Sequence, residues 1–294
     1  MPSAIQSVGF IGLGNIGRPM AEKLLGQPFS VQVYDVASAA TALLVESGAA
    51  AADDIVSMAA TCDYLALCVR DADDIESLLY GTRRDSEGSG DGLLHHAQRG
   101  ATLVIHSTVP QASVPKWAND AAGYGLDLVD APMTGGAQGA EAGRLCYMVG
   151  GSAATVARIT PILETSAEKI IHAGDTGAGI ALKLCNNLIT YAEFTAMSEA
   201  TRLATACGLD PDVLREGGRS NGIINEQMHS FVSNRDALLA NGNEEAIDTF
   251  FGAMGRLGKK DLDCVLATAA TKKLTMTATE HVRELIEAVF LGKA

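Results

Sequence analysis

The chain has 294 residues, which is more than one small core requires and which suits two domains. Nearly half of the residues (47%) are hydrophobic, so the chain can build a sizeable core and bulk disorder is excluded. The formal charge is −13, and an acidic chain repels nucleic-acid phosphates and anionic lipid surfaces, so we discount both as partners.

The six cysteines predict reduced, mostly buried thiols. No two of them form a CxxC pair, and the histidines show no HExxH pattern, which argues against disulfides and against a metal site. The first residues, MPSAIQSVGFIGLG, have no basic lead and run directly into an expected strand, unlike a signal peptide. The apolar stretches are too short or too interrupted to span a bilayer. We therefore expect a cytoplasmic protein that holds no metal.

The first 175 residues alternate between short apolar runs and segments with helical spacing. The runs show little polar alternation, which is typical of strands buried on both faces of a parallel sheet. The expected strands are 7–12, 31–35, 64–69, 102–107, 126–131, 145–149 and 169–172, and the helices between them include 19–25, 39–46, 73–80 and 153–163. This alternation predicts a doubly wound α/β domain.

Residues 81–100 interrupt the alternation, and their charge, glycine and serine content predicts a mobile surface loop. From about Gly179 the character changes, because 180–207 is long, apolar at helical spacing and poor in Gly and Pro. More helices are expected after it, with breaks at 208–211, 217–222, 241–243 and 255–258. We expect an α/β domain over 1–176 and an all-α domain over 177–294, joined by the long helix.

A glycine-rich motif follows the first expected strand and opens a helix: Gly12-Leu13-Gly14-Asn15-Ile16-Gly17. Gly12 allows the tight turn, Gly14 lets the backbone approach a pyrophosphate, and Gly17 lets helix and strand pack closely. The helix N-terminus offers N–H groups and the positive end of its dipole to the phosphates. Such a motif is weak evidence alone, but its position between strand and helix predicts a Rossmann dinucleotide-binding domain.

The second expected strand ends in an acidic residue, Asp35, 18 positions after Gly17. Its carboxylate can accept hydrogen bonds from the adenosine ribose hydroxyls, and its charge would repel a 2′-phosphate. The residues that follow, VASAAT, include no Lys or Arg that could hold such a phosphate. We therefore predict NAD rather than NADP as the cofactor, with a simple helix-capping role for Asp35 as the alternative.

Two residues at the start of the long helix, Lys183 and Asn187, are four positions apart and therefore share one helix face. Lys183 lies among apolar residues, where desolvation would lower its pKa as a general acid/base needs. Asn187 can hold a substrate hydroxyl without titrating. Taken alone, this stretch fits better with an ordinary surface lysine that covers apolar neighbours.

A third stretch, Asp130-Ala-Pro132-Met-Thr134-Gly135-Gly136, follows another expected strand. Ligands of doubly wound folds lie beyond the carboxyl ends of the strands. The Thr134 hydroxyl and the N–H groups of Gly135 and Gly136 can receive a carboxylate, because glycines allow close backbone approach. An ordinary turn at the end of a strand explains the stretch about equally well.

Taken together, these motifs resemble the β-hydroxyacid dehydrogenase family, which includes 3-hydroxyisobutyrate and tartronate semialdehyde enzymes. The family patterns GFIGLGxMGxPMA, DAPVSGG, GxGxxxKxxNN and KDL match residues 9–21, 130–136, 177–187 and 260–262. Their order and spacing cover nearly the whole chain, so the resemblance is specific. The chain departs from the pattern by Thr134 in place of serine, by Ile16 in place of methionine and by a longer loop after Tyr80.

The resemblance implies reversible hydride transfer between NAD(H) and a small β-hydroxy acid or semialdehyde. It implies that Lys183 is the catalytic acid/base, that Asn187 helps to position the substrate, and that residues 134–136 bind its carboxylate. It further implies cofactor contacts by four residues without a signal of their own: Val69, Arg70, Thr108 and Lys260. Family members pack their helical domains together, so a homodimer or homotetramer is expected.

Two alternative functions stay open from the sequence. The first is a related imine reductase that reduces C=N bonds; that family generally lacks this lysine and mostly uses NADPH, so Lys183 and Asp35 argue against it. The second is a non-catalytic dinucleotide-binding module, against which the joint presence of the glycine motif, Lys183 and Asn187 argues. The identity of the hydroxy acid and the physiological direction do not follow from the sequence.

Overall fold

The computed structural model describes residues 5–81 and 91–293. The chain divides into two compact units, Met1–Lys183 and Leu184–Ala294, and helix α9 (Ala178–Ala206) contains the point of division. Each unit has its own cluster of buried hydrophobic side chains. Within the described ranges, no helix combines the length and the apolar character that crossing a membrane requires.

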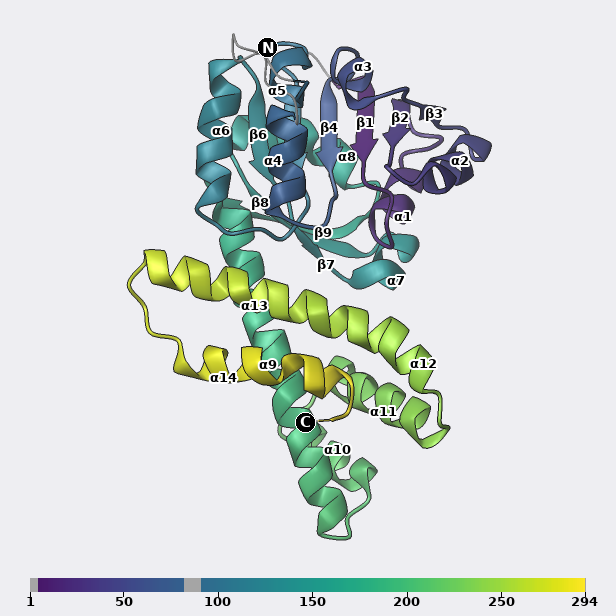
Figure 1. The fold of residues 1–294 in the computed structure, drawn as a ribbon, viewed down its shortest axis with the longest axis vertical. Coiled ribbons are helices and arrows are strands. Elements are labelled where there is room, and N and C mark those ends of the chain that lie inside the picture. Colours follow the sequence, from purple (N-terminus) through teal and green to yellow (C-terminus); the bar gives the residue numbers. More distant parts are fainter. Residues whose placement is uncertain (1–4, 82–90, 294) are drawn as a thin grey trace. The chain divides into compact units, whose positions relative to one another are not determined.

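The first unit is built on one sheet, which has nine strands in the described part of the chain (Figure 1). The strands are β1 Ser7–Ile11, β2 Ser30–Tyr34, β3 Ala50–Ala51, β4 Tyr64–Leu67, β5 Thr102–Ile105, β6 Asp127–Asp130, β7 Met133–Thr134, β8 Leu145–Gly150 and β9 Ala167–Gly174. Their order is β3-β2-β1-β4-β5-β6-β8-β7, and β9 pairs with β8. The pairs from β3 to β6 are parallel, so these strands end at the same edge.

Helices cover both faces of this sheet, which explains why its strands are apolar on both sides. The helices are α1 Gly17–Glu22, α2 Ser38–Glu46, α3 Ile55–Ala59, α4 Ala72–Tyr80, α5 Leu93–His96, α6 Ser113–Gly123, α7 Gly136–Ala142 and α8 Ala153–Leu163. On one face, Phe10 of β1 shares a buried cluster with Met20 of α1 and Ile159 of α8. On the other, a Cβ at Gly9 would lie 2.7 Å from Met58 of α3. Figure 1 shows α4 and α6 in front of the sheet and α8 behind it, so the expected doubly wound architecture is confirmed.

The second unit is helical throughout its described residues. After α9 come α10 Pro211–Ser220, α11 Glu226–Ala240, α12 Glu244–Ala246, the π-helix η1 Ile247–Gly252, α13 Ala253–Thr271 and α14 Thr277–Phe290. Aromatic rings fill its core: the rings of Phe194 and Phe231 stack with centroids 4.1 Å apart, and Phe290 meets both edge-on. The predicted all-α second half is therefore confirmed.

Most of the expected elements are present within a few residues of the predicted ends. All seven expected strands occur, and the long helix expected over 180–207 is α9. The two strands that were not expected, β3 and β7, have only two residues each and leave almost no periodic signal.

One of the expected helix breaks is wrong, because α13 continues through 255–258. The break expected over 217–222 is present but begins later, since α10 continues through Gly217 and Gly218 and ends at Ser220. At Gly255 the reason is close helix packing, because a Cβ there would lie 3.1 Å from the Cβ of Phe290 and 3.2 Å from the Cα of Glu287. Gly218 and Gly255 allow neighbouring segments to approach closely inside the helical unit, whereas the sequence pattern suggested that such glycines end helices.

The expected loop over 81–100 is only partly testable, because residues 82–90 lie outside the described ranges. Where it can be tested it is wrong in part: α5 forms there, and its Leu93 and Leu94 are buried. All six cysteines are described and are free thiols. Cys185 and Cys207 are exposed, so the expectation of burial fails for these two.

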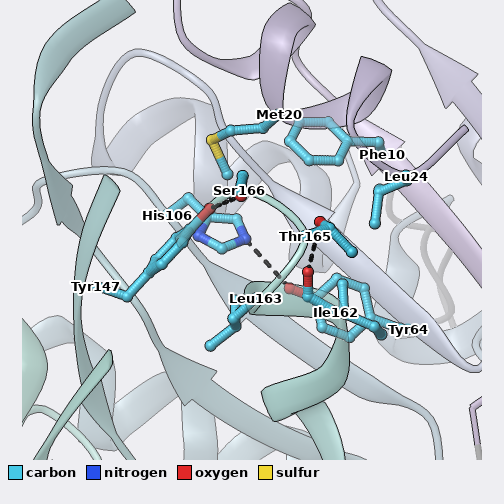
Figure 2. A pocket seen from close by; sticks show the side chains of 10 residues that line it. All are labelled: Phe10, Met20, Leu24, Tyr64, His106, Tyr147, Ile162, Leu163, Thr165 and Ser166. Carbon is cyan, nitrogen blue, oxygen red and sulfur yellow. Dashed lines mark hydrogen bonds between the residues drawn. The ribbon is translucent and has the colours of Figure 1, made fainter. Parts of the chain in front are cut away.

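A small cavity lies in the core of the first unit, among residues of β1, α1, β4, β8 and α8 (Figure 2). His106, which follows β5, is buried beside it. Its Nδ1 lies 2.8 Å from the carbonyl oxygen of Ala131 and its Nε2 lies 3.3 Å from the Tyr64 hydroxyl. Since a carbonyl only accepts, Nδ1 donates and Nε2 accepts, which is the arrangement of a neutral imidazole. Burial lowers the pKa of His106 to about 4, although the bond to Ala131 acts in the opposite direction.

Two adjacent glycines of α10 give a matched test of the helix. Gly217→Ala meets open space, and it should raise the free energy of unfolding by about 0.5–1 kcal/mol because glycine weakens a helix interior. A Cβ at Gly218 would lie 2.8 Å from the Cβ of Ile224, so Gly218→Ala should lower that free energy by about 1–3 kcal/mol. Urea unfolding of both variants measures the difference. Equal effects of the two substitutions would show that α10 is not built as described.

The neutral state of His106 has a direct test by NMR of the histidine side chains. The ring should show no titration between pH 7.5 and 5, whereas an exposed imidazole titrates near its ordinary pKa of 6.5. Because its folded-state pKa lies below 6.5, this group favours the folded state above pH 6.5, and that contribution is lost as the pH falls toward 4. A midpoint near 6.5 in the folded protein would contradict the buried, neutral assignment.

Candidate functional site

The candidate cofactor residues of the first unit lie at the carboxyl ends of the parallel strands, which together form the carboxyl edge of the sheet. The glycine motif follows β1, Asp35 follows β2, the pair Val69 and Arg70 follows β4, and Thr108 follows β5. From β1 the chain passes to β2 on one side and later to β4 on the other, so the strand order reverses between β1 and β4. In doubly wound sheets, ligands bind in the crevice at this point of reversal.

Three glycines of the motif lie in different surroundings. Gly12 has a φ of +94°, and a Cβ there would run into the carbonyl oxygen of Cys68. A Cβ at Gly17 would run into the carbonyl oxygen of Gly12, so these two glycines are required by the chain itself. Gly14 differs, because a Cβ there would meet nothing within 4 Å. Its small size leaves open space over the loop, which fits a phosphate group that approaches the backbone.

Asp35 is tied to the glycine motif. Its Oδ2 accepts the N–H of Leu13 at 2.7 Å and its Oδ1 accepts the N–H of Ala37 at 2.8 Å. Each oxygen keeps a second lone pair for another donor. Helix α2, which starts at Ser38, has no side-chain cap at its N-terminus, so Asp35 does not cap it. The Asp35 carboxylate thus fixes the backbone of the glycine motif and can still accept a hydrogen bond from a ribose hydroxyl.

The loops after β4 and β5 are linked by a residue that the sequence did not single out. The Ser107 hydroxyl donates to the carbonyl oxygen of Val69 at 2.6 Å and accepts its N–H at 3.1 Å. Thr108 follows directly and is partly buried. The neighbouring Arg70 is exposed, and its guanidinium binds both carboxylate oxygens of Asp74 at 3.0 Å. No periodicity or motif marked Ser107; only the pairing of β4 with β5 brings it to Val69.

The candidate carboxylate loop follows β6 and is pinned to β8. Met133 and Thr134 form β7, which pairs with Tyr147 and Cys146. Gly135 and Gly136 follow with φ values of +125° and +63°, a left-handed stretch that only glycine adopts easily. Helix α7 starts at Gly136 without a side-chain cap. Backbone N–H groups at such a start suit an anion.

The first turn of α9 meets this same edge. Asp130 accepts the N–H groups of Gly177 and Ile180, and burial raises its pKa to about 6 although these two bonds act in the opposite direction. Lys183 lies one turn further along and is partly buried. Burial raises the pKa of the Cys146 thiol, and the charges of Lys169 and Lys183 act against that rise. Cys146 is the strand partner of Thr134 in the candidate carboxylate loop.

The candidate residues of the helical unit gather around a buried carboxylate, Asp261. The amide nitrogen of Asn187 donates to its Oδ2 at 2.8 Å, and the Tyr191 hydroxyl donates to the same atom at 3.1 Å. The ammonium of Lys260 lies 3.1 Å from Oδ1. A carboxylate only accepts, so the NH₂ of Asn187 must face Asp261 and its Oδ1 points elsewhere. In the sequence Asp261 appeared only as part of the KDL pattern and had no role assigned; its charged neighbours Lys259, Lys260 and Asp263 gave no signal that it is buried.

The residues at the edge of the first unit fit a dinucleotide. Gly14 leaves room above the loop, the motif stands at the start of a helix without a side-chain cap, and the Asp35 carboxylate has free lone pairs. Residues 7–174 match the family described as the NAD binding domain of 6-phosphogluconate dehydrogenase, which covers more than half of the chain. This unit therefore binds a nicotinamide dinucleotide.

The most similar relatives include two bacterial dehydrogenases. One is 2-(hydroxymethyl)glutarate dehydrogenase of Eubacterium barkeri, 37% identical over 78% of this chain and 75% of that protein. The other is 3-hydroxyisobutyrate dehydrogenase of Pseudomonas aeruginosa, 39% identical over 71% of this chain and 67% of that protein.

A solved structure of 3-hydroxyisobutyrate dehydrogenase from Mycobacterium tuberculosis with L-serine shares the fold, with a TM-score of 0.81 and 25% identity. The alignment covers 97% of this chain and 98% of that one, so the likeness extends over both units. The level of identity to the relatives above and the match of the dinucleotide-binding family agree with the motifs of the sequence. The chain belongs to the β-hydroxyacid dehydrogenase family of NAD-dependent oxidoreductases.

Proposed function

We propose that the chain transfers hydride reversibly between NAD(H) and a small carboxylate-bearing β-hydroxy acid or semialdehyde, with Lys183 as the general acid/base. The observation that supports this most is that Asp130, at the end of β6, accepts the N–H groups of Gly177 and Ile180 and so holds the start of the Lys183 helix next to the strand that leads into residues 134–136. A lysine in that position can reach the hydroxyl of a substrate whose carboxylate lies at residues 134–136. The names of the relatives, which are dehydrogenases of hydroxy acids, favour the same reaction.

In this proposal the 1–176 segment binds the cofactor and the 177–294 segment completes the substrate site. When bound, the nicotinamide accepts the hydride in oxidation and supplies it in reduction. Lys183 removes the hydroxyl proton in oxidation and returns it in reduction. Thr134, Gly135 and Gly136 hold the substrate carboxylate, which sets the place of the reacting carbon.

The remaining candidate residues have supporting roles. The side-chain amide of Asn187 donates one N–H to Asp261, and its remaining polar atoms form a hydrogen bond with the substrate hydroxyl. Gly12 to Gly17 surround the pyrophosphate, and Asp35 binds the adenosine ribose. Val69, Arg70 and Thr108 line the cofactor from the ends of β4 and β5, and Lys260 contributes a positive charge toward it from α13. These roles follow the motif matches position by position.

We also propose a cytoplasmic homodimer or homotetramer. Six free thiols suit a reducing compartment. The helical unit exposes several large apolar side chains, including Leu203, Ile223, Phe250, Met254 and Leu257. An interface between copies of the unit would remove such apolar side chains from water.

Two other functions compete with this proposal. One is the reduction of imines, and the other is a non-catalytic role as a dinucleotide-binding module. A panel of small hydroxy acids and semialdehydes, assayed with NADH or NAD⁺, separates them from the proposal. Turnover of one carboxylate-bearing substrate supports the dehydrogenase. Turnover only of cyclic imines would favour the reductase, and NADH binding without turnover of either panel would favour the module.

The role of Lys183 is tested by Lys183→Ala. The variant should lose roughly 10²–10⁴-fold in kcat, the usual contribution of a general acid/base, while its Kd for NADH stays near the wild-type value. The matched control is Lys169→Ala, which removes an exposed lysine that also acts on Cys146. Steady-state kinetics and NADH fluorescence titration measure both. Near-normal turnover of Lys183→Ala would remove this lysine from the mechanism.

The preference for NAD is tested by Asp35→Asn. The wild type should have the higher kcat/KM with NADH, and the variant should narrow the NADH-to-NADPH ratio by roughly tenfold or more because the repulsion of a 2′-phosphate is gone. The amide oxygen can still accept the N–H of Leu13. Glu164→Gln, an equal change of charge at an exposed position, serves as control and should leave the ratio unchanged. A wild-type preference for NADPH would overturn the assignment.

A further inference from the structure

One buried carboxylate of the first unit has no role in the chemistry described so far. Asp130 is the last residue of β6 and is fully buried. Its Oδ1 accepts the N–H of Gly177 at 2.6 Å and its Oδ2 accepts the N–H of Ile180 at 2.7 Å. Both bonds are short, as expected for an ionised acceptor, and both donors belong to the start of α9.

Glycines around Asp130 make this contact possible. A Cβ at Gly150, the strand partner of Asp130, would lie 2.5 Å from the Oδ1 of Asp130. A Cβ at Gly179 would lie 2.9 Å from its Oδ2 and would also run into the carbonyl oxygen of Met148. No side chain therefore separates the first turn of α9 from the ends of β6 and β8. The carboxylate is the polar link between these elements.

Asp130 stands between two parts of the proposed site. On one side, Asp130 precedes Thr134 by four residues in the chain. The loop between them is held to β8, because the carbonyl oxygen of Pro132 accepts the N–H of Met148 at 2.9 Å. On the other side, Asp130 binds the first turn of α9, and Lys183 follows Ile180 by three residues on that helix. A helix is rigid over one turn, so a fixed first turn fixes the base of the lysine side chain.

We propose that Asp130 is a positioning residue for the reaction: its carboxylate holds the first turn of α9 against the loop at 134–136, so that Lys183 meets the hydroxyl of the bound substrate. This inference rests on the proposed function of Lys183 as acid/base. Asp130 itself touches neither substrate nor cofactor. An ordinary helix cap would stabilise the fold alone, whereas a positioning residue alters the chemical step in protein that is fully folded.

The test is Asp130→Asn, which keeps the shape but places an NH₂ group against one of the two N–H donors. Turnover is expressed per NADH-binding site, so unfolded protein does not count. We expect kcat per site to fall roughly tenfold to hundredfold, the effect of a small misplacement of a reacting group, with an NADH Kd near the wild-type value. With NADH deuterated at C4, the isotope effect on kcat should increase, because the chemical step becomes slower relative to product release.

The matched control is Asp63→Asn, which removes a carboxylate that accepts the N–H groups of Gln6 and Ser7 at the opposite edge of the sheet. This control should lower the melting temperature without changing kcat per site or the isotope effect. A wild-type kcat and isotope effect for Asp130→Asn, with only a lower melting temperature, would overturn the proposal.

A double variant separates this inference from the proposed function. If Asp130 acts through Lys183, adding Asp130→Asn to Lys183→Ala should cost little further kcat, because the two residues act as a unit. Normal turnover of Lys183→Ala alone would instead refute the acid/base role. An inactive Lys183→Ala together with a fully active Asp130→Asn would refute only the positioning role.

If Asp130→Asn does not fold, Gly150→Ala provides the second test, since its methyl group would press on the same carboxylate and on the backbone nitrogens of Ala178 and Gly179 that the carboxylate holds in place. A reduced kcat per site with intact NADH binding in that variant supports the proposal. Loss of NADH binding in both variants would overturn it, because Asp130 would then serve the folding of the unit as a whole.

Discussion

The parallel pairing of β2, β1, β4, β5 and β6 is the constraint on which the rest of the site depends. Strands that run in one direction end at one edge, so loops that are far apart in sequence become neighbours there. The glycine motif, Asp35, Val69, Thr108 and the 130–136 loop all follow such ends. Apolar side chains on both faces of the strands stabilise this sheet, because the helices on each face bury them away from water.

Three carboxylates then hold chain segments at this edge and in the helical unit. Asp35 holds the backbone of the glycine motif, Asp130 holds the start of α9, and Asp261 orients Asn187. Asp35 and Asp130 accept backbone N–H groups that a loop or helix start would otherwise leave without a partner, whereas Asp261 accepts the side-chain N–H of Asn187. The polar chemistry of the chain is thus organised by acceptors that do not themselves react, which suits a reaction in which the cofactor supplies the hydride.

The fold class and the positions of most elements could be predicted from the sequence, because apolar runs and helical spacing report burial directly. The break expected at Gly255 is wrong and α10 runs past Gly218 before it ends, since a sequence does not show whether a glycine ends a helix or makes room for a neighbouring side chain. The candidate site residues came from motif spacing. Ser107 and Asp261 were not assigned roles, because their partners lie 38 and 74 positions away and only the folded chain brings them together.

A crystal structure with NAD⁺ and a small unreactive hydroxy-acid analogue tests the central claim most directly, namely that the carboxyl edge of the sheet assembles the site. The account predicts the pyrophosphate over Gly14, the adenosine ribose at Asp35 and the carboxylate of the analogue against residues 134–136, with the ammonium of Lys183 in hydrogen-bond reach of its hydroxyl. A dinucleotide bound away from this edge, or a carboxylate held by another loop, would contradict it.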